Sequence, residues 1–253
     1  MTSIVRRLIV TAFASFWIAA VATPVLAEEI TVAVAANFTE PAKQIAAAFE
    51  KASGDKVTLS FGSSGQFYTQ IASGAPFEVF LSADADRPTK AEQAGLAVAG
   101  TRFTYAIGRL VLWSATPGLV DDHGAVLKGS GFSKLSIADP AAAPYGLAAI
   151  QTLKTLKIYD QLQPKIVQGS SIAQAFTFVK TGNAELGFVA LSQVINEPGG
   201  SRWLVPVSMH KPINQQAILL WTGTKNPAAT AFLKFLKGPQ ALAIIKRYGY
   251  EVR

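Results

Sequence analysis

Four segments of the chain place small or polar residues at the start of a predicted helix, directly after a predicted strand. They are Ala36-Asn37, Ser63-Ser64-Gly65, Pro144-Tyr145-Gly146 and Ser170-Ser171-Ile172. A helix N-terminus carries unpaired backbone N–H groups and a partial positive charge, and both favour a bound anion. Serine and asparagine side chains add further hydrogen-bond donors. Together these turns could form a site for a small anion.

Each turn taken alone also has a purely structural explanation. Ser and Asn cap helices in many proteins, so a single junction favours ordinary capping over a ligand site. What favours a shared site is the number of such turns, two in each half of the chain, because ligands of open α/β sheets bind beyond the carboxyl ends of strands. The pattern is compatible with an anion-binding cleft but specifies no particular anion.

The elements that position these turns follow from the hydrophobic pattern. Short apolar runs alternate with helical spacing along the chain, which predicts an α/β fold. The two similar halves predict two lobes with the cleft between them: residues 28–107 plus 208–253 in lobe 1, and 108–207 in lobe 2. Thr39 is the expected cap of the first helix. The predicted strands are Ile30–Val34, Lys56–Ser60, Glu78–Ser82, Leu110–Trp113, Leu135–Ala138, Lys165–Val167, Leu186–Ala190 and Ala217–Trp221.

The first residues have the layout of a secretory signal. Arg6 and Arg7 precede an uncharged apolar run, and a small-x-small sequence ends at Ala27. We therefore expect residues 1–27 to be a signal peptide that is cleaved after Ala27, and the mature protein to be periplasmic. An uncleaved membrane anchor is the alternative. Since the chain has no cysteine, neither disulfides nor a lipid anchor on an N-terminal cysteine is expected.

Charge and histidine content argue against two other classes of protein. Removal of Arg6 and Arg7 lowers the formal charge from +7 to +5, and the remaining basic residues are scattered along the sequence. Nucleic-acid binding is therefore not expected. His123 and His210 are the only histidines and fall in separate loop-like segments. They are predicted to be solvated residues and not ligands of a metal cation.

A serine hydrolase is a remote alternative. Ser53-Gly54-Asp55-Lys56 fits S-x-x-K and Lys180-Thr181-Gly182 fits K-T-G, motifs that penicillin-binding proteins combine. In those enzymes the serine begins a helix, whereas Ser53 lies where a helix is predicted to end. Lys180 likewise closes a helical pattern instead of lying on a strand. Because such short motifs often match by chance, we expect the chain not to be an enzyme.

Several segments resemble the periplasmic molybdate-binding family, in the same order and over nearly all of the mature chain. The resemblance implies the two-lobed type II fold of periplasmic binding proteins, with a mixed sheet flanked by helices in each lobe. It further implies a monomer without a cofactor that captures molybdate or tungstate and delivers it to the membrane permease of an ABC importer. The matching segments are Ile30–Phe38, Phe61–Gly65, Gln70–Pro76, Phe80–Asp84, Asp139–Pro140, Pro144–Gly146, Phe235–Ala241 and Arg247–Tyr250.

The same resemblance implies the ligand-binding residues. Asn37 and Ser64 would donate side-chain hydrogen bonds to the oxyanion from lobe 1, and Tyr145 and Ile172 would donate backbone N–H groups from lobe 2. Molybdenum or tungsten would be bound only as the oxyanion. Many members of the family carry a tyrosine whose hydroxyl reaches the anion where this chain has Ala190. The site therefore has one bond fewer, or another group compensates.

The four turns contain no Asp or Glu, which predicts selectivity. Molybdate, tungstate and sulfate are fully deprotonated near neutral pH, so all their oxygens accept hydrogen bonds. Phosphate at that pH carries a proton that needs an acceptor, and it should bind poorly to a site of donors alone. Sulfate would be excluded only by size, so a binding protein for sulfate or another small oxyanion remains an alternative. A sensor or adaptor that keeps the fold without import is a further one.

Overall fold

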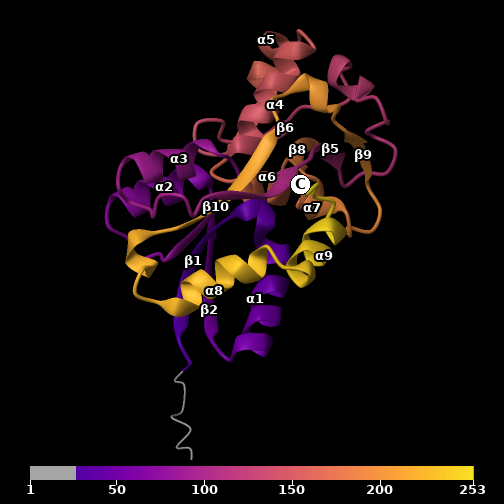
Figure 1. Ribbon diagram of the computed structural model, residues 1–253. Helices are drawn as coiled ribbons and strands as arrows, with labels where there is room; N and C mark the ends of the chain where they lie inside the picture. The colour runs from indigo at the N-terminus through magenta and orange to yellow at the C-terminus, as the bar shows by residue number, and fades with distance from the viewer. Residues whose placement is uncertain (1–26, 253) are drawn as a thin grey trace, which may run out of the picture.

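Residues 27–252, described by a computed structural model, form two α/β lobes that lie one above the other in Figure 1. Each lobe contains one five-stranded sheet, with the strand orders β2-β1-β3-β10-β4 and β7-β6-β8-β5-β9. The first three strands in each order are parallel, and the remaining pairings are antiparallel. The predicted two-lobed α/β fold is therefore confirmed. Apart from Ala27, the predicted signal peptide lies outside the described residues.

The first lobe is built from both ends of the chain. Its helices α1, α8 and α9 cover one face of the sheet, and α2 and α3 cover the other. The strands are β1 (Glu29–Ala35), β2 (Lys56–Gly62), β3 (Val79–Ser82), β4 (Phe103–Gly108) and β10 (Ile213–Leu219). The helices are α1 (Thr39–Ser53), α2 (Ser64–Ala72), α3 (Asp86–Gln93), α8 (Pro227–Leu236) and α9 (Pro239–Arg247).

The second lobe is built from one continuous stretch of chain. Neighbouring side chains of its central strand β5 point to opposite faces of the sheet: Leu112 packs with α4, whereas Val111 and Trp113 pack with α6 and α7. The strands are β5 (Leu110–Ser114), β6 (Leu135–Ala138), β7 (Ile166–Gly169), β8 (Leu186–Ala190) and β9 (Ser201–Leu204). The helices are α4 (Pro144–Thr155), α5 (Tyr159–Leu162), α6 (Ile172–Lys180) and α7 (Leu191–Val194).

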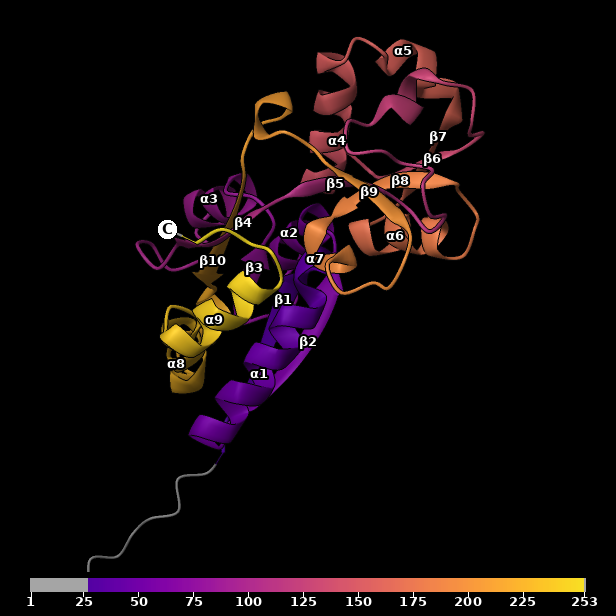
Figure 2. The same cartoon turned by 90° about the vertical axis from the view of Figure 1, so that its right-hand side faces the viewer.

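The C-terminal helices return to the first lobe. Figure 2 shows α8 and α9 beside α1, and the rings of Phe49 and Phe232 meet edge to face there with their centroids 5.4 Å apart. Gly238 lies between the two helices, immediately before Pro239 begins α9. Among residues 27–252, none of the helices combines the length and apolar character needed to cross a membrane.

The chain passes between the lobes at two places. One is Arg109, between β4 and β5, and the other is the segment 205–212, between β9 and β10. At the first crossing the hydroxyl of Tyr145 lies directly over the backbone of Gly108, where a Cβ atom would overlap it. A glycine is therefore required at the point where the chain leaves the first lobe.

Two local predictions are wrong. Thr39 does not cap α1 but is its first residue, and its hydroxyl donates to the carbonyl of Ala36 at 2.8 Å, within a short 3-10 turn labelled η1 (Ala36–Phe38). The last predicted strand, Ala217–Trp221, is β10, which begins at Ile213 and ends at Leu219. Gln215 and Gln216 interrupt its apolar pattern, so the first half of the strand does not look buried in the sequence.

The approach of α4 to the end of β6 provides a test of this packing. A Cβ atom at position 146 would overlap the carbonyl oxygen of Ala138, so Gly146→Ala should push the start of α4 away from β6. We expect the substitution to lower the free energy of unfolding by about 1–3 kcal/mol, measured by urea denaturation. Gly131→Ala is the matched control, because a Cβ atom there meets nothing within 4 Å. Equal stability of the two variants would contradict this account.

Candidate functional site

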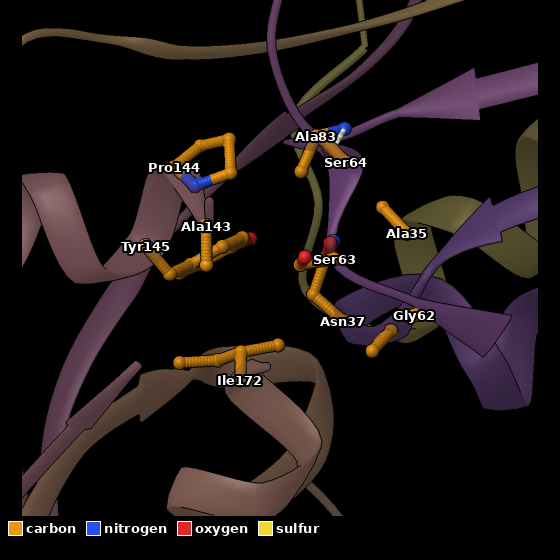
Figure 3. A pocket seen from close by; sticks show the side chains of 11 residues that line it. Ala35, Asn37, Gly62, Ser63, Ser64, Ala83, Ala143, Pro144, Tyr145 and Ile172 are labelled. Carbon is orange, nitrogen blue, oxygen red and sulfur yellow. Dashed lines mark hydrogen bonds between the residues drawn. The ribbon is translucent and has the colours of Figure 1, made fainter. Parts of the chain in front are cut away.

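A small pocket lies between the lobes, where β1, β2, β6 and β7 end. All four residues predicted from the sequence, Asn37, Ser64, Tyr145 and Ile172, line it. Figure 3 shows the residues of the first lobe facing those of the second across the pocket. The pocket is tight, with a cavity volume of about 10 Å³. Its other lining residues are Ala35, Ala36, Gly62, Ser63, Ala83, Ala143 and Pro144.

The two serines at the start of α2 have different tasks. Ser63 caps the helix: its hydroxyl oxygen accepts from the N–H of Gln66 at 3.3 Å, within a capping box. The hydroxyl oxygen of Ser64 accepts from the N–H of Ala83 at 2.9 Å, and its proton has no acceptor among residues 27–252. Ser64 is almost fully buried, so this proton remains free for a ligand in the pocket.

The second lobe contributes the first backbone N–H groups of two helices. Helix α4 begins with Pro144, which has no N–H, so Tyr145 supplies the first donor of that helix. Ile172 is the first residue of α6 and follows the cap Ser171, whose hydroxyl accepts from Gln174 at 3.3 Å. Within the described part of the chain, neither Tyr145 N–H nor Ile172 N–H donates to a carbonyl. Both donors are the unpaired groups that helix N-termini leave for capping or for a ligand.

Asn37 lines the pocket, but its amide is turned differently from what the predicted role requires. Its Nδ2 donates to Gln215 Oε1 at 2.7 Å and to the Tyr250 hydroxyl at 2.9 Å. Its Oδ1 is buried and has no hydrogen-bond partner in the described structure. In this orientation the free end of the amide is an acceptor, whereas an oxyanion needs a donor.

A buried polar network lies behind Asn37 and joins the two lobes. Tyr250 and Ser192 connect α7 of the second lobe to Asn37: their hydroxyls are 2.9 Å apart, and Ser192 donates to the Asn37 carbonyl at 2.8 Å. Gln215 lies 3.5 Å from the hydroxyl of Tyr145. Ser192, Gln215 and Tyr250 were not predicted from the sequence, since Gln215 and Tyr250 are 178 and 213 residues from Asn37 and carry no local signal.

Burial sets the acidity of the three tyrosines of this network. Loss of solvation raises the pKa of Tyr105 and Tyr145 well above the ordinary value of a tyrosine. It raises the pKa of Tyr250 to about 12, against the opposing effect of hydrogen bonds with Ser192 and Asn37. All three hydroxyls therefore stay protonated and uncharged near neutral pH.

The lobes touch at the edge of the pocket. The N–H of Gly65 donates to the carbonyl of Ala142 at 2.9 Å, and Arg87 Nη2 donates to the carbonyl of Ala141 at 2.6 Å. Arg87 also pairs with Asp84, so its charge is balanced by a carboxylate. The residues that line the pocket include neither Asp nor Glu. The site is thus closed over a set of uncharged groups.

Ala190 and the two histidines lie elsewhere. Ala190 ends β8, is buried, and donates its N–H to Gln193 Oε1 at 2.9 Å without lining the pocket. His123 is exposed. The prediction that His210 is solvated is wrong: it is buried where the segment before β10 packs against α4, with Nδ1 2.8 Å from the Lys211 carbonyl. Residues 27–252 contain no cluster of three or more His, Asp or Glu side chains that could hold a metal ion.

Comparison with known proteins agrees with this architecture. Residues 30–251 match the family described as bacterial extracellular solute-binding protein. The chain belongs to this family. Two relatives of this solute-binding protein are each called molybdate-binding protein ModA. The one from Rhodobacter capsulatus is 59% identical over 90% of each chain, and the one from Azotobacter vinelandii is 58% identical over 90% of this chain and 91% of its own.

A solved structure supports the same relationship. The periplasmic molybdate-binding protein of Azotobacter vinelandii superimposes with a TM-score of 0.87 and 45% sequence identity, covering 88% of this chain and 99% of its own. The resemblance seen in the sequence and the two-lobed type II fold that it implied are therefore confirmed. The roles of individual residues in binding stay predictions.

The raised pKa of Tyr250 makes stability depend on pH in the alkaline range. An unfolded tyrosine titrates near 10, whereas folded Tyr250 titrates near 12. Between these values the unfolded chain releases a proton that the folded chain keeps, so the free energy of unfolding falls as pH rises. We expect Tyr250→Phe to remove about 2 kcal/mol of this fall, measured by urea unfolding from pH 10 to 12. An identical pH slope in wild type and variant would contradict the assignment.

Proposed function

We propose that this solute-binding protein captures molybdate, and also tungstate, in the periplasm and delivers it to the permease of an ABC importer. The observation that carries the proposal is the convergence of free donors on one buried pocket. These donors are the Ser64 hydroxyl and the N–H groups of Tyr145 and Ile172. The names of the two relatives that share more than half of their aligned residues with this chain support molybdate as the ligand.

The chemistry of the pocket fits a tetrahedral anion without protons. Each oxygen of such an anion accepts hydrogen bonds, and uncharged donors held in an alanine-rich wall keep their geometry without competition from water. Hydrogen phosphate would place an O–H group against these donors, and no carboxylate lines the pocket to accept its proton. Sulfate has the same charge as molybdate, so the size of the pocket must discriminate between them.

Binding and lobe closure form one event in this proposal. The anion first meets Asn37 and Ser64, and the starts of α4 and α6 then close over it. We propose residues 28–107 plus 208–253, and residues 108–207, as the two moving bodies. The two short crossings at Arg109 and 205–212 support this division. The closed form is the one that the permease would recognise.

The location and oligomeric state complete the proposal. Membership of an extracellular family supports secretion, and the sequence pattern supports cleavage after Ala27. One chain supplies every residue that lines the pocket, so a monomer suffices for capture.

Catalysis has no comparable support. Ser53 ends α1 in the first lobe, and its hydroxyl donates to the Phe49 carbonyl at 3.1 Å. Lys180 ends α6 in the second lobe and pairs with Glu197 at 2.8 Å. The two residues of the hydrolase motifs thus belong to different lobes and already have partners. We propose a binding protein and not an enzyme.

Calorimetric titration of the mature protein with molybdate, tungstate, sulfate and phosphate tests the function. We expect tight binding of the first two anions and weak or no binding of phosphate. Ser64→Ala should weaken molybdate binding by roughly ten- to a hundredfold, because a hydrogen bond to a charged group is lost. Asn37→Ala combined with Ser64→Ala should abolish it. Ser53→Ala is the control and should bind as wild type.

Two alternatives have their own outcome in this titration, and the sensor or adaptor needs a separate measurement of molybdate uptake. Sulfate bound as tightly as molybdate would replace the proposed ligand with a general sulfate-type oxyanion. Absence of heat and of any thermal shift with all four anions would overturn the oxyanion proposal altogether. Molybdate bound by a protein without a permease partner would instead indicate the sensor or adaptor.

The contact between Gly65 and Ala142 tests closure separately from donor chemistry. A Cβ atom at position 65 would lie 2.9 Å from the Cα atom of Ala142. Gly65→Ala should therefore hold the lobes apart, weaken molybdate binding about tenfold or more, and leave the scattering profile of the protein open with ligand present. Gly131→Ala, in open space, should close normally. A closed profile for Gly65→Ala would contradict the mechanism.

A further inference from the structure

The side-chain amide of Asn37 has one end, Oδ1, that is unpaired within the described residues. Within the described residues, three buried side-chain atoms lack a hydrogen-bond partner: Asn37 Oδ1, Arg109 Nε and His210 Nε2. Only Asn37 belongs to the pocket lining. With Nδ2 directed at Gln215 and Tyr250, Oδ1 is the end of the amide that remains for the pocket. An acceptor at this position opposes the oxygen of a deprotonated anion.

Gln215 is the partner that fixes this orientation. The hydroxyl of Tyr250 accepts from Asn37 Nδ2 and donates to the Asn37 carbonyl at 2.8 Å; it can turn its proton to Oδ1 instead, because Ser192 also donates to that carbonyl. Gln215 cannot face both ends of the Asn37 amide without turning its own amide, because it presents an acceptor at one end and a donor at the other. Gln215 is 0% exposed, and its Oε1 accepts from Asn37 at 2.7 Å. Whichever end of Gln215 faces Asn37 therefore decides which end of Asn37 faces the pocket.

The present orientation leaves a second mismatch in the network. The single hydroxyl proton of Tyr105 meets two acceptors at 3.2 Å, the Ser82 carbonyl and Gln215 Oε1. It can satisfy only one of them.

Rotation of the Asn37 and Gln215 side-chain amides together, each by about 180°, would remove the acceptor from the pocket and the shared proton at Tyr105. Gln215 Nε2 would then donate to Asn37 Oδ1 and to the Tyr105 hydroxyl, which would donate in turn to the Ser82 carbonyl. Gln215 Oε1 would accept from Tyr145, and Asn37 Nδ2 would turn to the pocket as a donor. The two ends of an amide have nearly the same shape, so the packing is unchanged.

We propose that Gln215 is a positioning residue that sets the polarity of Asn37 toward the bound oxyanion and thereby selects deprotonated over protonated anions. The proposal rests on the oxyanion-binding function above. With Asn37 Nδ2 in the pocket, the site is composed of donors and fits molybdate. With Oδ1 there, the site contains an acceptor and fits the proton of hydrogen phosphate.

Gln215→Glu tests the proposal, because a carboxylate offers only acceptors. It would hold Asn37 Nδ2 toward position 215 and leave Oδ1 in the pocket. We expect the ratio of molybdate to phosphate affinity to fall by roughly ten- to a hundredfold. A pure charge effect would instead weaken the binding of both dianions alike and leave the ratio unchanged, and that outcome would overturn the proposal.

Asn37→Ser provides the matched background. A serine hydroxyl rotates freely and needs no fixed amide orientation, so Gln215→Glu should change the affinity ratio little in an Asn37→Ser protein. A double-mutant cycle of the two substitutions should show a coupling of about tenfold or more in molybdate affinity. Additive effects would show that Gln215 does not act through Asn37.

Gln215→Met covers the case in which a buried carboxylate prevents folding. This neutral variant releases Asn37, so the ratio of molybdate to phosphate affinity should fall to a value between those of wild type and Gln215→Glu. An unchanged ratio would overturn the proposal.

In the wild type, the side-chain amide ¹⁵N resonance of Asn37 should shift on addition of molybdate. Wild type that binds no oxyanion would refute the proposed function, whereas wild-type binding with no coupling would refute only the role of Gln215.

Discussion

A backbone N–H group that is buried without an acceptor is strongly unfavourable, and the cleft collects such groups. Tyr145 and Ile172 supply the first N–H groups of α4 and α6 at the junction of the lobes, where both residues are buried away from the water that would otherwise accept from them. The oxygens of a ligand are the natural replacement. This constraint explains why the helices point their N-termini at one place, and it supports the proposed coupling of ligand binding to lobe closure.

The residues that line the pocket in the described structure are all uncharged. Alanines form much of its wall, and the nearby Arg87 is balanced by Asp84 and engaged with the backbone of the opposite lobe. Because no lysine or arginine among residues 27–252 lines the pocket, the distances are set by backbone elements and by small residues such as Gly65 and Gly146. A rigid frame of this kind can discriminate by size, which a long lysine side chain could not.

The local part of the structure could be predicted from the sequence. Strand, turn and helix follow one another within about a dozen residues, so the four turns were identified from neighbouring residues, whereas Ser64, Tyr145 and Ile172 were assigned as donors by the resemblance to a known family. The buried polar network could not be, because Gln215 and Tyr250 meet Asn37 only through tertiary pairing. His210 and the start of β10 were misjudged for the same reason: burial of polar residues depends on distant partners that a local pattern does not contain.

The position of β10 in the first sheet has a consequence for the order of folding. In that sheet β4 pairs with β10, and a further bridge joins Ile107 to Glu251. Both partners of this edge therefore come from the last forty or so residues of the chain, whereas the second lobe completes its sheet from residues 110–204 alone. When the chain folds from its N-terminus, the second lobe can assemble once residue 204 is available, while the sheet of the first lobe stays incomplete until β10 and Glu251 are available. Folding of the lobe that begins the described chain is thus completed only by C-terminal residues.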